Sequence, residues 1–102
     1  MIAIGSDGFL ARPEEWDEAT ALILAETVGI PLTQAHWEII YFIRTYHQKF
    51  AHLPNNRLFV RAVSQALGPE KGDSQRLNQL FDGKPVRNAC LIAGLPRPPG
   101  CL

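Results

Sequence analysis

The segment from about residue 34 to residue 51 most constrains the fold, because it is the longest stretch that can form one uninterrupted helix. Thr33 stands directly before it and is a good N-cap residue. The apolar face of this predicted helix comprises Ala35, Ile39, Phe42, Ile43, Tyr46 and Phe50, widened by Trp37, Ile40 and Tyr41. A stripe of this width predicts a central, largely buried helix.

The N-terminal part of the chain predicts a hairpin and a helix. Ile2 and Ile4 alternate with smaller residues ahead of a turn at residues 5–8, so residues 1–11 are expected to form a short β-hairpin. Pro13 and the two glutamates after it mark the start of a helix, which Gly29 ends. The apolar stripe of that helix is expected to consist of Trp16, Ala19, Ile23 and Val28.

Three shorter helices and a non-helical tail follow. The helices are predicted at residues 56–67, closed by Gly68-Pro69, from Asp73 or Ser74 to Gly83, and from Pro85 to Gly94. Residues 95–102 contain three prolines and therefore predict an extended, polyproline-like arm. The predicted fold class is mainly α, in a single domain. It is a small orthogonal helical bundle (residues 12–93) with a short N-terminal β-hairpin (1–11) and a mobile, extended C-terminal arm (94–102).

Composition excludes several classes of protein. The 102 residues are 46% apolar and have a formal net charge of zero, which excludes a globally basic nucleic-acid binder and a polybasic membrane tail. Two cysteines are too few for a disulfide-stapled secreted scaffold. Neither a secretory signal nor an apolar run of about 20 residues is visible, so we expect a cytoplasmic protein without direct membrane insertion.

The zero net charge hides an asymmetry along the chain. Residues 1–51 hold seven acids and three bases, whereas residues 52–102 hold seven bases and three acids. Both cysteines, Cys90 and Cys101, lie in the basic half. The C-terminal segment is therefore the first candidate site.

The three histidines are a weaker candidate site. The positions of His36, His47 and His52 match no short zinc-binding spacing. The first two lie about 16 Å apart along one predicted helix, so they cannot bind one ion. We expect all three to be surface or partly buried residues without ligand roles.

The predicted helices near residues 33–51 and 56–67 also resemble a helix-turn-helix. Arg57 and Arg61 would then project from the first turns of a recognition helix. The acidic N-terminal half and the lack of a basic arm argue against duplex DNA as a ligand. A DNA-binding regulator is therefore kept only as an alternative, and nucleic acid is not an expected partner.

The two cysteines are separated by ten residues, and the second is the penultimate residue. Three prolines stiffen the segment, and the seven residue steps from Gly94 to Cys101 span at most about 23 Å. Such an arm can insert a thiol into another protein, or fold back to bring Cys101 within disulfide distance of Cys90. The helix end beside Cys90 and the terminal carboxylate both disfavour a thiolate, so we expect a carrier, not an autonomous thiol enzyme.

The end of the chain, residues 89–102 (ACLIAGLPRPPGCL), resembles the terminal ACxxAGLPKPxGC signature of the DsrC/TusE/DsvC family of sulfur-relay proteins. Weaker matches are Asp7-Gly8-Phe9-Leu10, Leu32-Thr33 with His36-Trp37, Arg57 with Ala62-Val63, and residues 70–74 with Leu80-Phe81. The resemblance covers nearly the whole chain.

The resemblance implies a sulfur carrier in which Cys101 bears sulfur as a persulfide on a mobile arm. Cys90, with ten residues between it and Cys101, marks the DsrC type. The leading expectation is thus a DsrC-like partner of dissimilatory sulfite reductase in sulfur oxidation or sulfite reduction. In that chemistry Cys90 and Cys101 become joined by a disulfide or trisulfide, and a heterodisulfide-reductase-like membrane complex regenerates the thiols. No cofactor is implied beyond the covalently bound sulfur.

The TusE type of the same family is the alternative. Its members generally lack the second cysteine, accept sulfur from TusBCD-like or DsrEFH-like sulfurtransferases and serve tRNA 2-thiouridine formation. In either case the second half of the chain is expected to steer acidic partners, or oxyanions such as sulfite, with the basic residues Arg57, Arg61, Lys84, Arg87 and Arg97.

Overall fold

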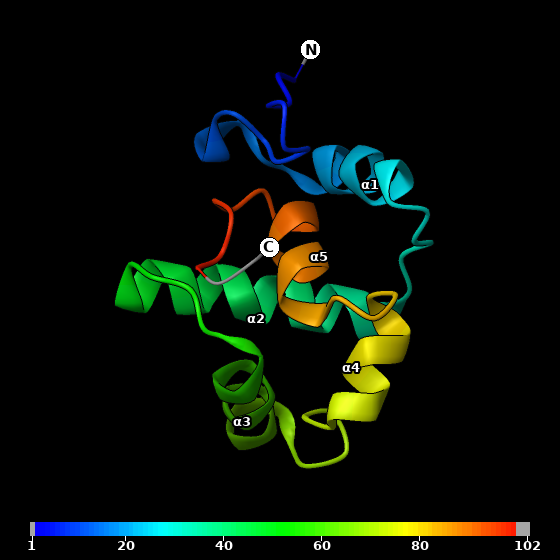
Figure 1. The fold of residues 1–102 in the computed structure, drawn as a ribbon, viewed down its shortest axis with the longest axis vertical. Coiled ribbons are helices and arrows are strands. Elements are labelled where there is room, and N and C mark those ends of the chain that lie inside the picture. The colour runs from blue at the N-terminus through cyan, green and yellow to red at the C-terminus, as the bar shows by residue number, and fades with distance from the viewer. Residues whose placement is uncertain (1, 100–102) are drawn as a thin grey trace.

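Five α-helices and one short 3₁₀ helix form the part of the chain that the computed structural model describes, residues 2–99 (Figure 1). In chain order they are η1 (Pro13–Glu15), α1 (Glu18–Thr27), α2 (Gln34–Phe50), α3 (Asn56–Leu67), α4 (Ser74–Leu80) and α5 (Pro85–Ile92). The prediction of a mainly helical bundle is confirmed. None of the helices in this range is long and apolar enough to cross a bilayer.

Helix α5 occupies the centre of the bundle, and the other four helices pack against it (Figure 1). All of its residues except Arg87 are buried. A helix of eight residues is too short to be stable alone, so its surroundings hold it in place. The sequence had favoured α2 as the central, largely buried helix. That expectation is wrong, because α2 buries one face while Tyr41 and Phe50 on it are 43% and 48% exposed.

The predicted first helix is divided in two. Pro13–Glu15 makes a single 3₁₀ turn, and the backbone is extended at Trp16 before α1 begins at Glu18. The carboxylate of Asp17 causes this division, because it caps α1 by accepting a hydrogen bond from the Thr20 amide (2.8 Å). The same hydrogen bond lowers the pKa of Asp17 below its ordinary value.

The later start of α1 also changes which of its side chains face the core. The predicted stripe through Ala19 and Ile23 is wrong, since Ala19 is exposed and Ile23 is 48% exposed. The residues of α1 that are buried are Thr20, Ala21, Leu24 and Ala25.

The predicted β-hairpin at residues 1–11 is also wrong. Within residues 2–11 the pairing is limited to one antiparallel bridge between Ile4 and Leu10. The Asp7 carboxylate accepts a hydrogen bond from the Phe9 amide (3.0 Å), which tightens the turn. Phe9 and Leu10 are neighbours yet both are buried, which a pleated strand with alternating faces does not allow.

The remaining helix boundaries follow the local signals in the sequence. The side chain of Asn55 caps α3 by accepting from the Leu58 amide (2.9 Å), and Asp73 caps α4 by accepting from the Arg76 amide (3.0 Å). Pro85 is the first residue of α5, as predicted. These boundaries are set by contacts within one helical turn, which is why sequence patterns locate them.

The observed face of α1 is tested by a matched pair of substitutions. Leu24→Ala, at a fully buried side chain, is expected to lower the free energy of unfolding by about 2–4 kcal/mol, because it leaves a cavity. Leu22→Ala, at a side chain that is 55% exposed, should change it by less than about 0.5 kcal/mol. Urea denaturation followed by circular dichroism measures the free energy of unfolding of both variants. If both variants lose the same amount of stability, this orientation of α1 is wrong.

Candidate functional site at the root of the C-terminal arm

The arm begins at a tight turn that closes α5. Gly94 has a positive φ of 71°, and its amide donates to the Leu91 carbonyl (3.2 Å). The Leu95 amide donates to the Cys90 carbonyl (3.0 Å). This pair of bonds is the Schellman arrangement of a helix C-terminus, and the burial of Leu95 is typical of it. The turn therefore sets the direction in which the arm leaves the bundle.

Two side chains from distant parts of the chain hold the end of α5. The Trp16 indole Nε1 donates to the Ile92 carbonyl (2.9 Å), and Arg44 Nη1 donates to the Ala93 carbonyl (2.6 Å). The last carbonyls of a helix lack partners within the helix, so these bonds satisfy groups that would otherwise be buried and unpaired. The positive guanidinium also interacts favourably with the negative end of the helix dipole.

Trp16 and Arg44 support each other. The Arg44 guanidinium carbon lies 4.0 Å from the centre of the Trp16 ring, a cation–π distance. Burial lowers the pKa of Arg44 from its ordinary value, and arginine still keeps its proton at neutral pH. We call these two residues the Trp16–Arg44 pair.

Two further aromatic side chains, Tyr41 and Trp37, pack beside the Trp16–Arg44 pair. Tyr41 packs edge-on against Trp16 with ring centres 6.0 Å apart, and it stacks on Trp37 at the same distance. The Tyr41 hydroxyl donates to the Glu18 carboxylate, and this hydrogen bond raises the pKa of Tyr41. These contacts limit the positions that the indole can take over the arm root.

Gly94 is required at the arm root for two reasons. Its positive φ favours glycine, and a Cβ at this position would lie 2.4 Å from the Trp16 ring. The indole thus packs directly on the backbone where the arm begins. Beyond the turn, Leu95 and Pro98 are buried, whereas Pro96, Arg97 and Pro99 are exposed.

The two candidate cysteines differ in what the structure describes. Cys90 lies in the last turn of α5 and is fully buried. Cys101, with Gly100 and Leu102, lies outside the described residues 2–99.

The five predicted partner-binding cations lie on three elements. Arg57 and Arg61 are exposed on α3, Lys84 is exposed directly before α5, and Arg97 is exposed on the arm. Arg87 is partly buried, with its guanidinium carbon 5.5 Å from the centre of the Phe9 ring. Their role in binding a partner stays a prediction.

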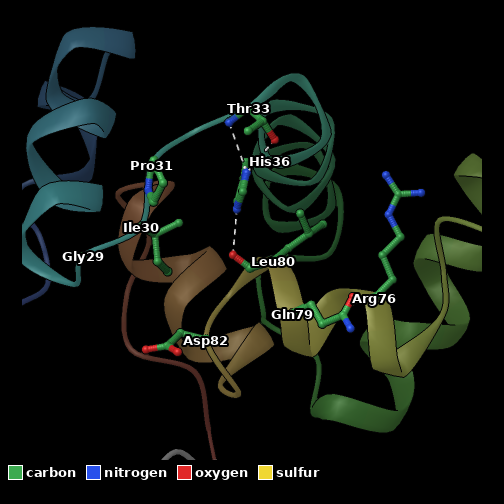
Figure 2. Close-up of a pocket in the computed structure, with 9 residues that line it drawn as sticks. All are labelled: Gly29, Ile30, Pro31, Thr33, His36, Arg76, Gln79, Leu80 and Asp82. Carbon is green, nitrogen blue, oxygen red and sulfur yellow. Dashed lines mark hydrogen bonds between the residues drawn. The ribbon is translucent and has the colours of Figure 1, made fainter.

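A cavity of about 550 Å³ beside the start of α2 is a second candidate (Figure 2). His36 lies in its wall, where its Nδ1 accepts from the Thr33 amide (3.1 Å) and its Nε2 lies 2.7 Å from the Leu80 carbonyl. Since Nδ1 accepts, Nε2 carries the proton and donates to Leu80. The chain thus occupies both ring nitrogens, and His36 joins the start of α2 to the end of α4.

This placement corrects part of the expectation for the histidines. His36 is buried, not a surface or partly buried residue, because its ring closes the space between two helices and packs edge-on against Phe81 (5.3 Å). His47 is partly buried and His52 is exposed, as expected. Within residues 2–99 no group of three or more histidine, cysteine or acidic side chains could hold a metal ion.

The description of the matching protein-family model is "DsrC like protein", and the match spans residues 1–102. The chain belongs to this DsrC-like family. The resemblance of the chain to the DsrC/TusE/DsvC family is thereby confirmed. Family membership supports a role in sulfur relay.

Some relatives of the DsrC-like chain are named TusE, and others are named DsrC. Sulfurtransferase TusE of Yersinia pseudotuberculosis is 42% identical over 102 residues, which is 100% of this chain and 94% of that protein. The solution structure of DsrC from Allochromatium vinosum matches with a TM-score of 0.89 at 38% identity, covering 99% of this chain and 90% of that one.

A crystal structure is similar as well. The oxidised γ-subunit of dissimilatory sulfite reductase (DsrC) from Archaeoglobus fulgidus matches with a TM-score of 0.83 at 38% identity. The match covers 99% of this chain and 92% of that one. The fold of the DsrC-like chain is therefore the fold of these solved proteins.

Sequence reasoning missed the Trp16–Arg44 pair. It placed Trp16 on the apolar stripe of a helix and counted Arg44 only as a charge. Gly94 was recognised as a helix end, but its close contact with Trp16 joins residues far apart in the chain. No spacing rule connects such residues, so only the folded chain brings them together.

The contact between Gly94 and Trp16 is tested by Gly94→Ala. The new methyl group would collide with the indole, so we expect a loss of more than about 1 kcal/mol of stability and a changed Trp fluorescence spectrum. Gly83→Ala is the control, because Gly83 also has a positive φ (81°) but has no heavy atom within 4 Å of the added Cβ. Urea denaturation and fluorescence emission compare the two variants. Equal losses of stability in both, with an unchanged Trp emission spectrum, would contradict the role of the contact between Gly94 and Trp16.

Proposed function

We propose that this DsrC-like chain is a sulfur carrier that accepts sulfur as a persulfide on Cys101 and passes it to a second protein. The observation that carries the proposal is full-length similarity to proteins named sulfurtransferase TusE, in a chain that ends in a cysteine-bearing arm. The arm root adds support, because Gly94 and the Trp16–Arg44 pair set the point at which the arm leaves the bundle. A fixed root reduces the conformational entropy that the arm loses when it enters a partner.

The proposed transfer step is a thiol exchange. The Cys101 thiolate attacks the outer sulfur of a persulfide on a donor cysteine, and the donor cysteine leaves as a thiolate. One sulfur–sulfur bond forms and one breaks, so the outer sulfur moves to Cys101 without an external oxidant or reductant. Delivery repeats the same exchange with an acceptor thiol.

Within the family, we propose a TusE-type role as the first candidate. Relatives along the full length carry the name TusE, and the complete burial of Cys90 fits a transfer that uses Cys101 alone. The donor would then be a TusBCD-like sulfurtransferase, and the acceptor would serve tRNA 2-thiouridine formation. This role was the alternative of the sequence analysis, and the names of the relatives favour it over the DsrC-type reading.

The DsrC-type role is the second candidate, and the position of Cys90 favours it. Cys90 lies in the last turn of α5, and its carbonyl takes part in the turn that starts the arm. Opening this turn would expose the Cys90 thiol. Its thiolate would attack the Cys101 sulfur of the persulfide, and the products would be a Cys90–Cys101 disulfide and hydrogen sulfide. The two thiols are oxidised, and the transferred sulfur is reduced.

The carrier proposal is tested by intact-mass analysis after incubation of the reduced full chain with a persulfide-bearing donor protein. The wild type is expected to gain about 32 Da for one sulfur atom. Cys101→Ala is expected to gain nothing, because it lacks the accepting thiolate. Circular dichroism confirms that the variant is folded, and an adduct that persists in Cys101→Ala would contradict the proposal.

The two types of carrier are separated by Cys90→Ala under the same conditions. A TusE-type carrier keeps the wild-type amount of adduct, because Cys90 takes no part in the transfer. A DsrC-type carrier instead loses about 2 Da as a monomer and releases sulfide, and both effects disappear in Cys90→Ala. Mass spectrometry and a sulfide assay distinguish these outcomes.

A further inference from the structure

A groove lies between the C-terminal half of α2 and the outer face of α3. It has a volume of about 410 Å³ and opens to solvent. Its apolar lining consists of Phe42, Tyr46 and Phe50 from α2 and Leu58, Ala62 and Ala66 from α3. We call this feature the α2–α3 groove. It is separate from the arm root and from the cavity of Figure 2.

The α2–α3 groove exposes large apolar side chains. Phe50 is 48% exposed and Leu58 is 46% exposed. The α2 residues form a continuous aromatic strip, with ring centres 4.7 Å apart for Tyr46 and Phe50 and 6.2 Å apart for Phe42 and Tyr46. A contiguous exposed apolar surface of this kind is typical of a binding site for another protein. The stripe at every fourth position of α2, beside the apolar residues of α3, fits a third helix.

The charges around the α2–α3 groove are all positive. The charged residues in its lining are Lys49 and Arg61, and the Lys49 ammonium lies 5.6 Å from the centre of the Phe50 ring. Neither residue forms an ion pair with a carboxylate within residues 2–99. The lining of the groove therefore carries a local positive charge, although the whole chain has zero net charge. An occupant with acidic residues beside an apolar stripe would complement it.

The α2–α3 groove and the arm root lie on opposite sides of α2. Phe42 and Tyr46 are each two residues from Arg44, which is about 200° around the helix. Arg44 contacts the arm root, and Figure 1 shows the arm above α2 and α3 below it. A helix is about 10 Å thick, whereas the chain from Gly94 to Cys101 reaches up to about 23 Å. A protein seated in the groove can therefore present its reactive sulfur within reach of the arm.

We propose that the α2–α3 groove binds an acidic amphipathic helix on the protein that donates sulfur to Cys101. This inference rests on the proposed function and adds a docking site to it. The groove holds the donor through apolar and ionic contacts, while the arm alone carries out the thiol exchange. Binding and chemistry are then assigned to different residues, so they can be tested separately.

Binding is measured by calorimetry between the persulfide-donor protein and the full-length Cys101→Ala chain, which docks without exchanging sulfur. Lys49→Glu/Arg61→Glu is expected to raise the Kd about tenfold or more, with a smaller difference at about 300 mM salt than at about 50 mM. Leu58→Ser is expected to raise the Kd at both salt concentrations. Wild-type affinity in both variants would overturn the proposal.

The matched control is Arg12→Glu/Arg76→Glu, which makes the same change in net charge away from the groove. Both residues lie outside the groove lining, and glutamate is well tolerated in the first turn of α4, where Arg76 lies. The control is expected to keep the Kd within about twofold of the parent chain. An equal loss of donor affinity in the control would show that only the net charge matters, and it would overturn the proposed docking site.

Transfer kinetics separate a failed docking site from a failed carrier function. In the chain with Cys101 intact, Lys49→Glu/Arg61→Glu is expected to slow transfer at low donor concentration and to recover the wild-type rate at saturation. Cys101→Ala should abolish transfer at every concentration. If Cys101→Ala abolishes transfer but the groove variants transfer normally, the docking site is wrong and the carrier function stands. If Cys101→Ala still accepts sulfur, the carrier function itself is wrong.

Carbodiimide coupling identifies the occupant directly. This reagent joins a lysine amine to a carboxylate in contact with it, so Lys49 is expected to become linked to an acidic helix of the donor. Reversing that donor carboxylate to lysine should then restore binding to Lys49→Glu/Arg61→Glu. A link to a carboxylate outside a helix, or no rescue, would overturn the proposed partner chemistry.

Two other possible occupants of the α2–α3 groove would give different experimental results. The outer face of α1 exposes Leu22 and Ile23 near Glu18 and Glu26, so a second copy of this chain is a natural competitor. Sedimentation that shows self-association lost in Lys49→Glu/Arg61→Glu, with unchanged donor binding, would overturn the proposal. Binding of single-stranded RNA that Phe50→Ala and the charge reversal both abolish, with unchanged donor binding, would overturn it too.

Discussion

The burial of α5 is the constraint on which the rest of the structure depends. Eight residues cannot form a stable helix in water, yet this helix carries the start of the C-terminal arm. It is stable because four other helices cover it and because the Trp16–Arg44 pair satisfies the carbonyls at its end. Without these hydrogen bonds the carbonyls would be buried and unpaired, which would destabilise the turn at the arm root. The same contacts therefore support both the fold and the candidate site.

A carrier protein benefits from such an arrangement. The arm starts from the Gly94 turn, where the direction of the chain is set by two hydrogen bonds and by the Trp16 ring. The proposed docking groove is on the other side of α2, so a partner can be held without blocking the arm. Cys90 is a buried residue of the last turn of α5, directly before the arm root.

The boundaries of α3, α4 and α5 could be predicted because they depend on neighbouring residues. Asn55, Asp73 and Pro85 act within one turn, and their effect does not require the rest of the molecule. The first helix shows the limit of this reasoning. Pro13 and Asp17 are both good start signals four residues apart. Asp17 caps α1, and Trp16, which lies between the two signals, bonds to the end of α5.

The other corrections have the same cause. Phe9 and Leu10 both enter the core, which prevents the predicted hairpin, and His36 is buried because it joins α2 to α4. Each depends on which distant surface is available for packing. A pattern within one segment contains no information on that surface.

The sequence by itself determined the helical content, most of the caps, the glycine that ends α5 and the family signature around the two cysteines. These features depend on residues that are close in the chain, where propensity and hydrogen bonding are local. Only the tertiary structure decided that α5 is central, that Trp16 and Arg44 hold the arm root, and that α2 and α3 leave an apolar groove with positive charges. Those features join residues up to 76 positions apart, and their contacts exist only after the helices have packed.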